Sequence, residues 1–159
     1  ATVLGVDRSA ARLSRARAAP PNALLVRADL PDFWRLLAAS DDLEVAETFL
    51  LYPNPYPKRA HLRRRWAGHA CLPSLLAAAG ARVTLRASWR TYLDEFRLAV
   101  EAAAACGDER AATLVRAGAA GPYDLAPPPP ERALTHFEAK YAAAGAPLYE
   151  LVLGAPDSS

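Results

Sequence analysis

Methionine is absent from the sequence, cysteine is scarce, and no apolar run is long enough to cross a membrane. The two cysteines, Cys71 and Cys106, lie in alanine-rich stretches without a partner spacing, so we interpret them as reduced thiols of a cytoplasmic protein. The three histidines are scattered, and neither a metal-ligand motif nor a signal peptide is visible. The chain opens at Ala1 directly in a strand-like run, which indicates trimming, processing or an incomplete N-terminal segment.

The bulk composition is that of an ordinary globular domain. The 159 residues suffice for one domain with its own core, which we place over 1–159. Hydrophobic residues make up 52% of the chain and charged residues 23%, and the formal net charge is only +2. Because the chain is not a polycation, affinity for nucleic acid would have to come from a local patch of positive charge.

Apolar runs alternate with helix-like segments along the chain. The predicted strands are Thr2–Val6, Ala23–Val26, Val45–Tyr52, Ala81–Leu85 and Leu148–Leu153. The predicted helices are Arg8–Ala18, Pro31–Ala39, a segment from just after Pro57 to about Ala79 with a kink at Pro73, Trp89–Ala105 and Thr135–Ala144. Between Gly107 and Pro130 the pattern is ambiguous, and the one strand it suggests lies at Thr113 to Val115. The alternation indicates an α/β domain with a mostly parallel sheet and helices on both faces.

Ligands of such sheets bind beyond the carboxyl ends of the strands. Two predicted strands are followed there by an acid, Asp7 and Asp29. An acid at this place commonly accepts hydrogen bonds from ribose hydroxyls. Each acid has an equally ordinary structural interpretation: Asp7 as the N-cap of the next helix, with Ser9 as an alternative cap, and Asp29 as a cap or turn residue before Pro31.

The segment from Tyr52 to Lys58 is less ordinary, because three prolines alternate with Asn54 and Tyr56. Proline fixes φ and removes a backbone donor, so the segment is a rigid loop and not a strand. We call it the proline loop, residues 52–58. Its place after a predicted strand makes it a stiff polar and aromatic lip over the ligand edge of the sheet, and we favour a functional role for it.

Five cations and one histidine accompany the end of this loop: Lys58, Arg59, His61, Arg63, Arg64 and Arg65. On a helix, Arg59 and Arg63 would share the outer face, while Leu62 and Trp66 would dock on the sheet. A solvated helix face is the usual explanation of such a charge run. Its concentration beside the proline loop favours a phosphate backbone as its partner instead.

Two motifs together resemble the bacterial tRNA (guanine-N7)-methyltransferases. The run Tyr-Pro-Asn-Pro-Tyr-Pro-Lys-Arg-Ala-His-Leu-Arg-Arg-Arg at 52–65 is similar to that family's Phe-Pro-Asp-Pro-Trp-(Pro/His)-Lys signature and the His- and Arg-rich segment after it. Thr135-His136-Phe137-Glu138 resembles the family's Thr-x-Phe-Glu motif, although the same spacing is also a capping box. Asn22 with Asp29, and Leu4 to Asp7, are weaker matches, and together the matches cover nearly the whole chain.

The resemblance implies a Rossmann-like class I methyltransferase fold, the cofactor S-adenosylmethionine and a tRNA substrate. It implies that Asp7 contacts the cofactor's ribose, that Asp29 contacts its adenine side, and that Asn54 borders the cofactor at the family's catalytic acid position. The implied substrate contacts are Lys58, Ser88, Thr135, His136, Phe137 and Glu138. The implied RNA contacts are Arg59, His61, Arg63, Arg64 and Arg65. Guanine N7 is already nucleophilic and carries no proton, so catalysis would consist mainly of positioning and electrostatic help.

The chain departs from the family at polar positions. Asn54 stands where the family has aspartate, Ala87-Ser88 stand where it has Thr-Asp, and Tyr56 replaces its usual tryptophan. The eight glycines include no Gly-x-Gly pattern, so the glycine-rich loop that follows the family's first strand is absent. We therefore expect the first strand and helix of the fold to be missing from this sequence, and we favour a missing N-terminal segment over a lost loop. Two other functions fit these departures: a non-catalytic RNA-binding or partner subunit on the same scaffold, and a small-molecule methyltransferase.

Overall fold

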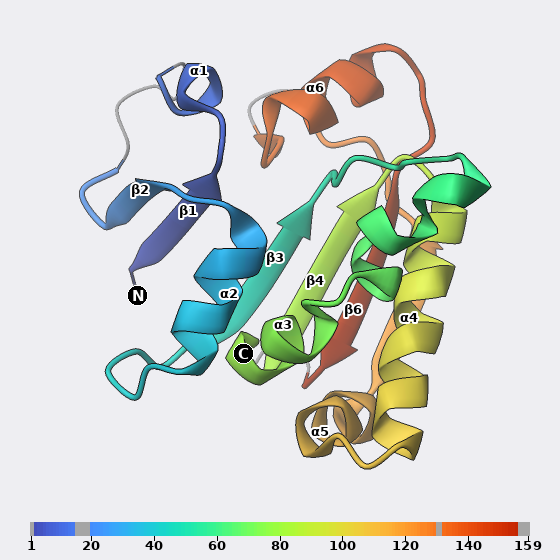
Figure 1. Cartoon of the computed structure of the whole chain (residues 1–159). Coiled ribbons are helices and arrows are strands. Elements are labelled where there is room, and N and C mark those ends of the chain that lie inside the picture. Colours follow the sequence, from blue (N-terminus) through green and yellow to red (C-terminus); the bar gives the residue numbers. More distant parts are fainter. Residues whose placement is uncertain (1, 15–19, 130–131, 156–159) are drawn as a thin grey trace.

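Helices and strands alternate through the computed structural model, which describes residues 2–14, 20–129 and 132–155 (Figure 1). The described strands are β1 (Val3–Asp7), β2 (Ala23–Arg27), β3 (Glu47–Leu51), β4 (Arg82–Ala87), β5 (Ala119–Asp124) and β6 (Tyr149–Gly154). The described helices are α1 (Ala10–Leu13), α2 (Leu30–Ala38), α3 (Leu72–Ala78), α4 (Arg90–Ala105), α5 (Glu109–Ala117) and α6 (His136–Ala143), with 3₁₀ turns η1 (Arg59–Arg64) and η2 (Trp66–Gly68). The predicted α/β class is confirmed.

The strands form two sheets, and only half of the pairings are parallel. The β1–β2 pair is parallel and stands alone, while the second sheet has the order β3-β4-β6-β5. Within it β3 and β4 are parallel, but β6 is antiparallel to both β4 and β5. The prediction of a mostly parallel sheet is therefore wrong. The reason is that β6 begins beside the carboxyl end of β4, where Tyr149 pairs with Ala87, and so must run back along the sheet.

Two local predictions also fail. Residues 57–79 do not form one kinked helix, because Arg65 and His69 take extended backbone angles and divide the segment into η1, η2 and α3. Pro73 does not kink a helix but lies in the first turn of α3, where its missing N–H costs nothing. The strand suggested at Thr113 to Val115 is part of α5, which the Asp108 carboxylate caps by accepting from the Ala111 N–H. Residues 15–18 of the first predicted helix lie outside the described residues.

The core lies on one face of the four-stranded sheet. Val83 and Leu85 of β4 and Leu151 and Leu153 of β6 point to this face, and Figure 1 shows α3 and α4 in front of it, with α5 beside the lower end of α4. The buried residues they meet there include Leu75 and Leu76 of α3, Phe96 and Val100 of α4, and Leu114 of α5. Burial of these side chains from water is the main force that closes this layer.

The opposite face of the same sheet is charged. Thr84 and Arg86 alternate with the core residues of β4 and so point away from α4. The Thr84 hydroxyl donates to the Glu47 carboxylate at 3.0 Å, and Arg86 donates to Glu150 at 2.6 Å. Phe49 of β3 is half-exposed on this face. In the described part of the chain, the predicted cover of helices on both faces is thus found on one face only.

None of the helices formed by the described residues combines the length and apolar character that a membrane span requires.

Candidate functional site

A pocket of about 260 Å³ opens beyond the carboxyl ends of β3 and β4. The proline loop forms one wall, the residues at and after the end of β4 form another, and Phe137 and Tyr141 of α6 line a third side. It is lined by Arg12, Tyr52, Pro53, Asn54, Pro55, Ala87, Ser88, Trp89, Tyr92, Phe137 and Tyr141. Three residues predicted for the site from distant parts of the sequence, Asn54, Ser88 and Phe137, therefore meet at one place.

The proline loop is held in a strained conformation. Both tyrosines that precede a proline, Tyr52 and Tyr56, have positive φ angles of 51° and 43°. Bulky residues rarely adopt this left-handed region, and each such residue costs on the order of 1–3 kcal/mol. Such strain persists only where the surroundings fix it, and each tyrosine here has its own anchor.

Glu138 is the anchor of Tyr52. Its side chain is 0% exposed, and one carboxylate oxygen accepts from the Tyr52 hydroxyl and from the Arg86 guanidinium, each at 2.8 Å. The other oxygen accepts from the Leu134 N–H. Burial works to raise the pKa of Glu138, but the Leu134 N–H, the Tyr52 hydroxyl and Arg86 together hold it below its ordinary value. The pKa of Tyr52 is raised mainly by burial and, second, by its hydrogen bond to Glu138.

The capping box predicted at residues 135–138 is present with one change. Thr135 caps α6 by accepting from the Glu138 N–H at 3.1 Å. The Glu138 carboxylate reaches Leu134 and not the Thr135 N–H that a capping box would use. Glu138 and Thr135 therefore fix the start of α6, and Phe137 beside them faces the pocket. His136 is exposed and its ring lies near that of Phe137. Substrate contacts by Thr135, His136, Phe137 and Glu138 stay predictions.

Arg65 is the anchor of Tyr56, and here the structure differs from the prediction of an RNA contact. The Arg65 side chain is 4% exposed, and its guanidinium lies 4.8 Å from the centre of the Trp89 ring. It donates to the carbonyl oxygens of Tyr56 and Pro57 and to the Glu95 carboxylate. With its donors directed inward, Arg65 does not belong to the charged surface.

The remaining predicted RNA contacts do form a surface patch. Lys58, Arg59, Arg63 and Arg64 are exposed, and none of them forms an ion pair within the described residues. We call these four residues the cationic patch. Residues three apart share one side of the 3₁₀ turn η1. Arg59 and Arg63, which are four apart, therefore do not share a face as they would on the predicted α-helix.

Residues around the cationic patch connect it to the proline loop. The Arg64 guanidinium lies 5.8 Å from the centre of the Tyr56 ring, and the ring of the half-buried His61 packs edge-on against the same tyrosine. Trp66 packs against the core through Trp34 of α2, whereas Leu62 is 43% exposed and does not dock on the sheet.

The two predicted cofactor acids lie at the carboxyl ends of the neighbouring strands β1 and β2. The Asp7 carboxylate accepts from the Ser9 N–H at 2.7 Å and from Arg12 at 2.9 Å, so it acts as a local turn partner. Asp29 precedes α2, is exposed, and makes no capping hydrogen bond through its side chain. Arg12 also lines the pocket, so the Asp7–Arg12 pair connects these strand ends to it.

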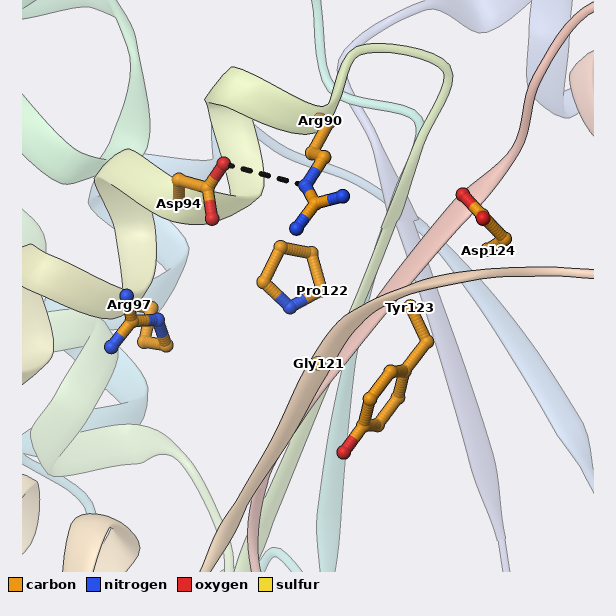
Figure 2. A pocket seen from close by; sticks show the side chains of 7 residues that line it. All are labelled: Arg90, Asp94, Arg97, Gly121, Pro122, Tyr123 and Asp124. Atoms are coloured by element: carbon orange, nitrogen blue, oxygen red, sulfur yellow. Dashed lines mark ion pairs between the residues drawn. The ribbon is translucent and has the colours of Figure 1, made fainter.

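A larger open pocket of about 530 Å³ lies elsewhere, between α4 and the edge strand β5 (Figure 2). Its arginines already have partners: Arg90 lies 3.8 Å from Asp94, and Arg97 donates to Glu101 at 2.6 Å. Figure 2 shows Tyr123 and Asp124 directed apart on the β5 side. This pocket contains none of the residues that the sequence predicts for a site, so we place the candidate site at the smaller one. The described residues contain no group of three His, Cys, Asp or Glu side chains that could hold a metal ion.

Several residues of the site were not predicted. Tyr141 could have been found, because it follows Phe137 by four positions on one helix face. Arg12 looked like any cation of a basic helix, and Arg86 and Glu95 carry no local signal, since their partners are 52 and 30 positions away.

No protein-family model matches the chain, and no curated protein matches it.

Proposed function

We propose that the protein is a cytoplasmic methyltransferase of the class I type that uses S-adenosylmethionine to methylate N7 of guanine in tRNA. The observation that carries this proposal is the pocket beyond β3 and β4, where Asn54, Ser88 and Phe137 meet, while Arg64 of the cationic patch lies against Tyr56 of the proline loop. The resemblance of residues 52–65 and 135–138 to the tRNA (guanine-N7)-methyltransferases supports the same conclusion.

The pocket suits one flat base better than a whole nucleotide with its cofactor. Its volume of about 260 Å³ is below the usual range for drug-sized ligands, roughly 300–1,000 Å³. The Trp89, Phe137 and Tyr141 rings offer faces on which an unstacked base can lie. The Asn54 amide and the Ser88 hydroxyl can donate to and accept from the polar edge of guanine. These contacts would orient N7 without any proton transfer, because N7 carries none.

S-adenosylmethionine supplies the electrophilic methyl group. The chain's residues fit its adenosine half, since the exposed Asp29 carboxylate makes no capping hydrogen bond with α2 and Asp7 lies at the end of the adjacent strand. The fit at Asp7 requires a ribose hydroxyl to share the carboxylate with Arg12. The described residues contain no glycine-rich turn for the methionine half. We therefore assign Asp7 and Asp29 to the adenosine and assign no contact beyond it.

The cationic patch would bind the tRNA backbone. Each neutralised phosphate contributes to the salt dependence of binding, with a slope of log K against log salt of about −0.7 to −0.9. Arg63→Ala with Arg64→Ala should therefore flatten the slope by roughly 1.5. Arg110→Ala is the matched control, because Arg110 is an exposed arginine on α5, away from the patch. An unchanged slope in the double variant would remove the RNA role of the patch.

The deciding experiment is methyl transfer from labelled S-adenosylmethionine to unmodified tRNA, followed by nucleoside analysis. We expect the label in 7-methylguanosine, and we expect Asn54→Ala to reduce it strongly while the Arg110→Ala control keeps it. Label in another nucleoside would refute the guanine assignment. No label, from protein shown to be folded by circular dichroism, would refute the enzymatic proposal.

A second candidate is a non-catalytic RNA-binding subunit. The observation that favours it is the Asp7 carboxylate, whose two oxygens are already bonded to Ser9 and Arg12. This candidate predicts salt-dependent tRNA binding that depends on Arg63 and Arg64 but no measurable affinity for S-adenosylhomocysteine.

A further inference from the structure

Arg65 stands apart from its charged neighbours because all of its donors are used inside the protein. Nε and Nη2 donate to the Tyr56 carbonyl at 3.1 and 3.0 Å, and Nη2 also reaches the Pro57 carbonyl at 3.3 Å. Nη1 donates to both oxygens of Glu95, at 2.6 Å to the second. A planar fork of five N–H donors matches this arrangement, and the ammonium group of lysine does not.

The bonds of Arg65 continue to the pocket through the loop backbone. Tyr56, whose carbonyl Arg65 holds, donates its own N–H to the Asn54 Oδ1 at 3.4 Å. Asn54 in turn lines the pocket. The order Glu95, Arg65, Tyr56 backbone, Asn54 side chain is therefore a continuous series of contacts from α4 to the site.

We propose that Arg65, itself fixed by Glu95, is a positioning residue that sets the orientation of the Asn54 amide in the pocket. This inference rests on the proposed function for the role of Asn54 but not for the anchoring of the loop. Arg65 holds the strained Tyr56 in its left-handed conformation, and without the two-pronged bond the Tyr56–Pro57 peptide relaxes and takes Asn54 with it. The sequence presents Arg63, Arg64 and Arg65 as equals, whereas the structure divides them into two surface cations and one anchor.

The test uses Arg65→Lys, which keeps the charge and loses the fork, beside Arg110→Lys as a matched control, because Arg110 is an exposed arginine of α5 outside the cationic patch. Glu95→Gln is a second variant that leaves Arg65 in place, in case Arg65→Lys does not fold. Amide hydrogen exchange detected by NMR reports the loop at Tyr56 and Asn54 and the core at Phe96. Methyl transfer to tRNA, with kcat and KM separated, reports the site.

We expect exchange at Tyr56 to rise about tenfold in Arg65→Lys, since one lost hydrogen bond is worth about that factor. In Arg65→Lys, exchange at Phe96 should stay unchanged, and kcat should fall while the KM for tRNA and the salt slope of tRNA binding stay constant. The Arg110→Lys control should match the unmodified protein in every measurement. Glu95→Gln should show the same pattern with smaller changes.

Unchanged exchange at Tyr56 in Arg65→Lys would overturn the inference. An equal rise in exchange at Phe96 would also overturn it, because Arg65 would then stabilise the whole fold. A flatter salt slope of tRNA binding would overturn it as well, because Arg65 would then be a phosphate contact. If the unmodified protein transfers no methyl group but the loop still loosens in Arg65→Lys, the anchoring by Arg65 is supported and the proposed function fails.

Discussion

Replacing Glu138 by glutamine is the sharpest test of how the site is held together. Three donors face this buried carboxylate: the Tyr52 hydroxyl, the Leu134 N–H and Nη1 of Arg86. A glutamine amide of the same shape can turn either way, but in both orientations its NH₂ group faces a donor. The change therefore removes the charge that balances Arg86 and also leaves at least one buried donor without an acceptor.

The size of the loss follows from what Arg86 keeps. Removing one partner of a buried ion pair costs about 3–5 kcal/mol. Arg86 retains its bond to Glu150 at 2.6 Å, so we expect the lower end, about 3 kcal/mol. With a urea slope of about 2 kcal/mol per M, the midpoint of unfolding should fall by about 1.5 M. Urea titration followed by tryptophan fluorescence measures this directly.

Glu150→Gln is the matched control. Glu150 binds the same arginine but is 26% exposed in its side chain, so water can replace it and the loss should stay below about 1 kcal/mol. Equal losses in the two variants would show that the buried position of Glu138 does not matter. A loss under about 0.5 kcal/mol in Glu138→Gln would refute the description of Glu138 as the anchor of Tyr52 and α6.

The pH dependence of the same variant follows from the direction of the pKa shift. The pKa of Glu138 is lower in the folded protein than its ordinary value of 4.5, so the folded state favours the ionised carboxylate. The contribution of the ionised Glu138 carboxylate to the free energy of unfolding is complete above the pKa of this group in the unfolded chain. It is lost as the pH falls through the pKa of the group in the folded protein. The difference in unfolding free energy between the unmodified protein and Glu138→Gln should therefore be constant near neutral pH and shrink below pH 4.5. A difference that grows on acidification would contradict the ion pair.

Two further predictions concern the body of the fold. Gly80→Ala should cost about 1–3 kcal/mol in thermal unfolding, because a Cβ at Gly80 would overlap the rigid backbone of Ala46, whereas Gly5→Ala would meet only a flexible side-chain end and should cost less. An exposed Cys106 should react at once with a thiol reagent, while Cys71, which is buried with a raised pKa, should react only on unfolding, so Cys106→Ser should abolish the fast phase.

The sequence was enough to predict the strands and helices that are encoded by the pattern of neighbouring residues. Strands such as Glu47–Leu51 and Arg82–Ala87 and the helix Arg90–Ala105 lie within a few residues of their predicted bounds. The predicted helix over 57–79 failed because the conformation of this segment depends on Arg65, whose partners Tyr56 and Glu95 are brought to it by the tertiary fold. The direction of the last strand failed for a similar reason, since alternation of helices and strands does not show which way a strand returns.

The structure brings some of the predicted site residues together, and it shows protein contacts of Glu138 and Arg65 that the sequence did not reveal. Composition marked Asn54 and the cations, because rigid proline loops and clustered charge are visible in a single sequence. Phe137 was named only through the resemblance of residues 135–138 to a family motif. Burial is not visible in the same way. Glu138 and Arg65 read as ligands of a substrate and of RNA, yet one is 0% and the other 4% exposed, and both serve other protein groups.

Glu138 and Arg65, two buried charged side chains, both hold the proline loop in its strained conformation. Tyr52 and Tyr56 both precede prolines, and both have the left-handed backbone that such residues avoid. Their combined cost, on the order of 2–6 kcal/mol, would relax the loop unless interactions outside it offset the strain. Glu138 holds the first tyrosine by its hydroxyl, and Arg65 holds the second by its carbonyl. Asn54 lies between these two fixed points, so its orientation depends on both anchors. A variant of either anchor should therefore disturb the same pocket, although the anchors lie on different elements and do not share a bond.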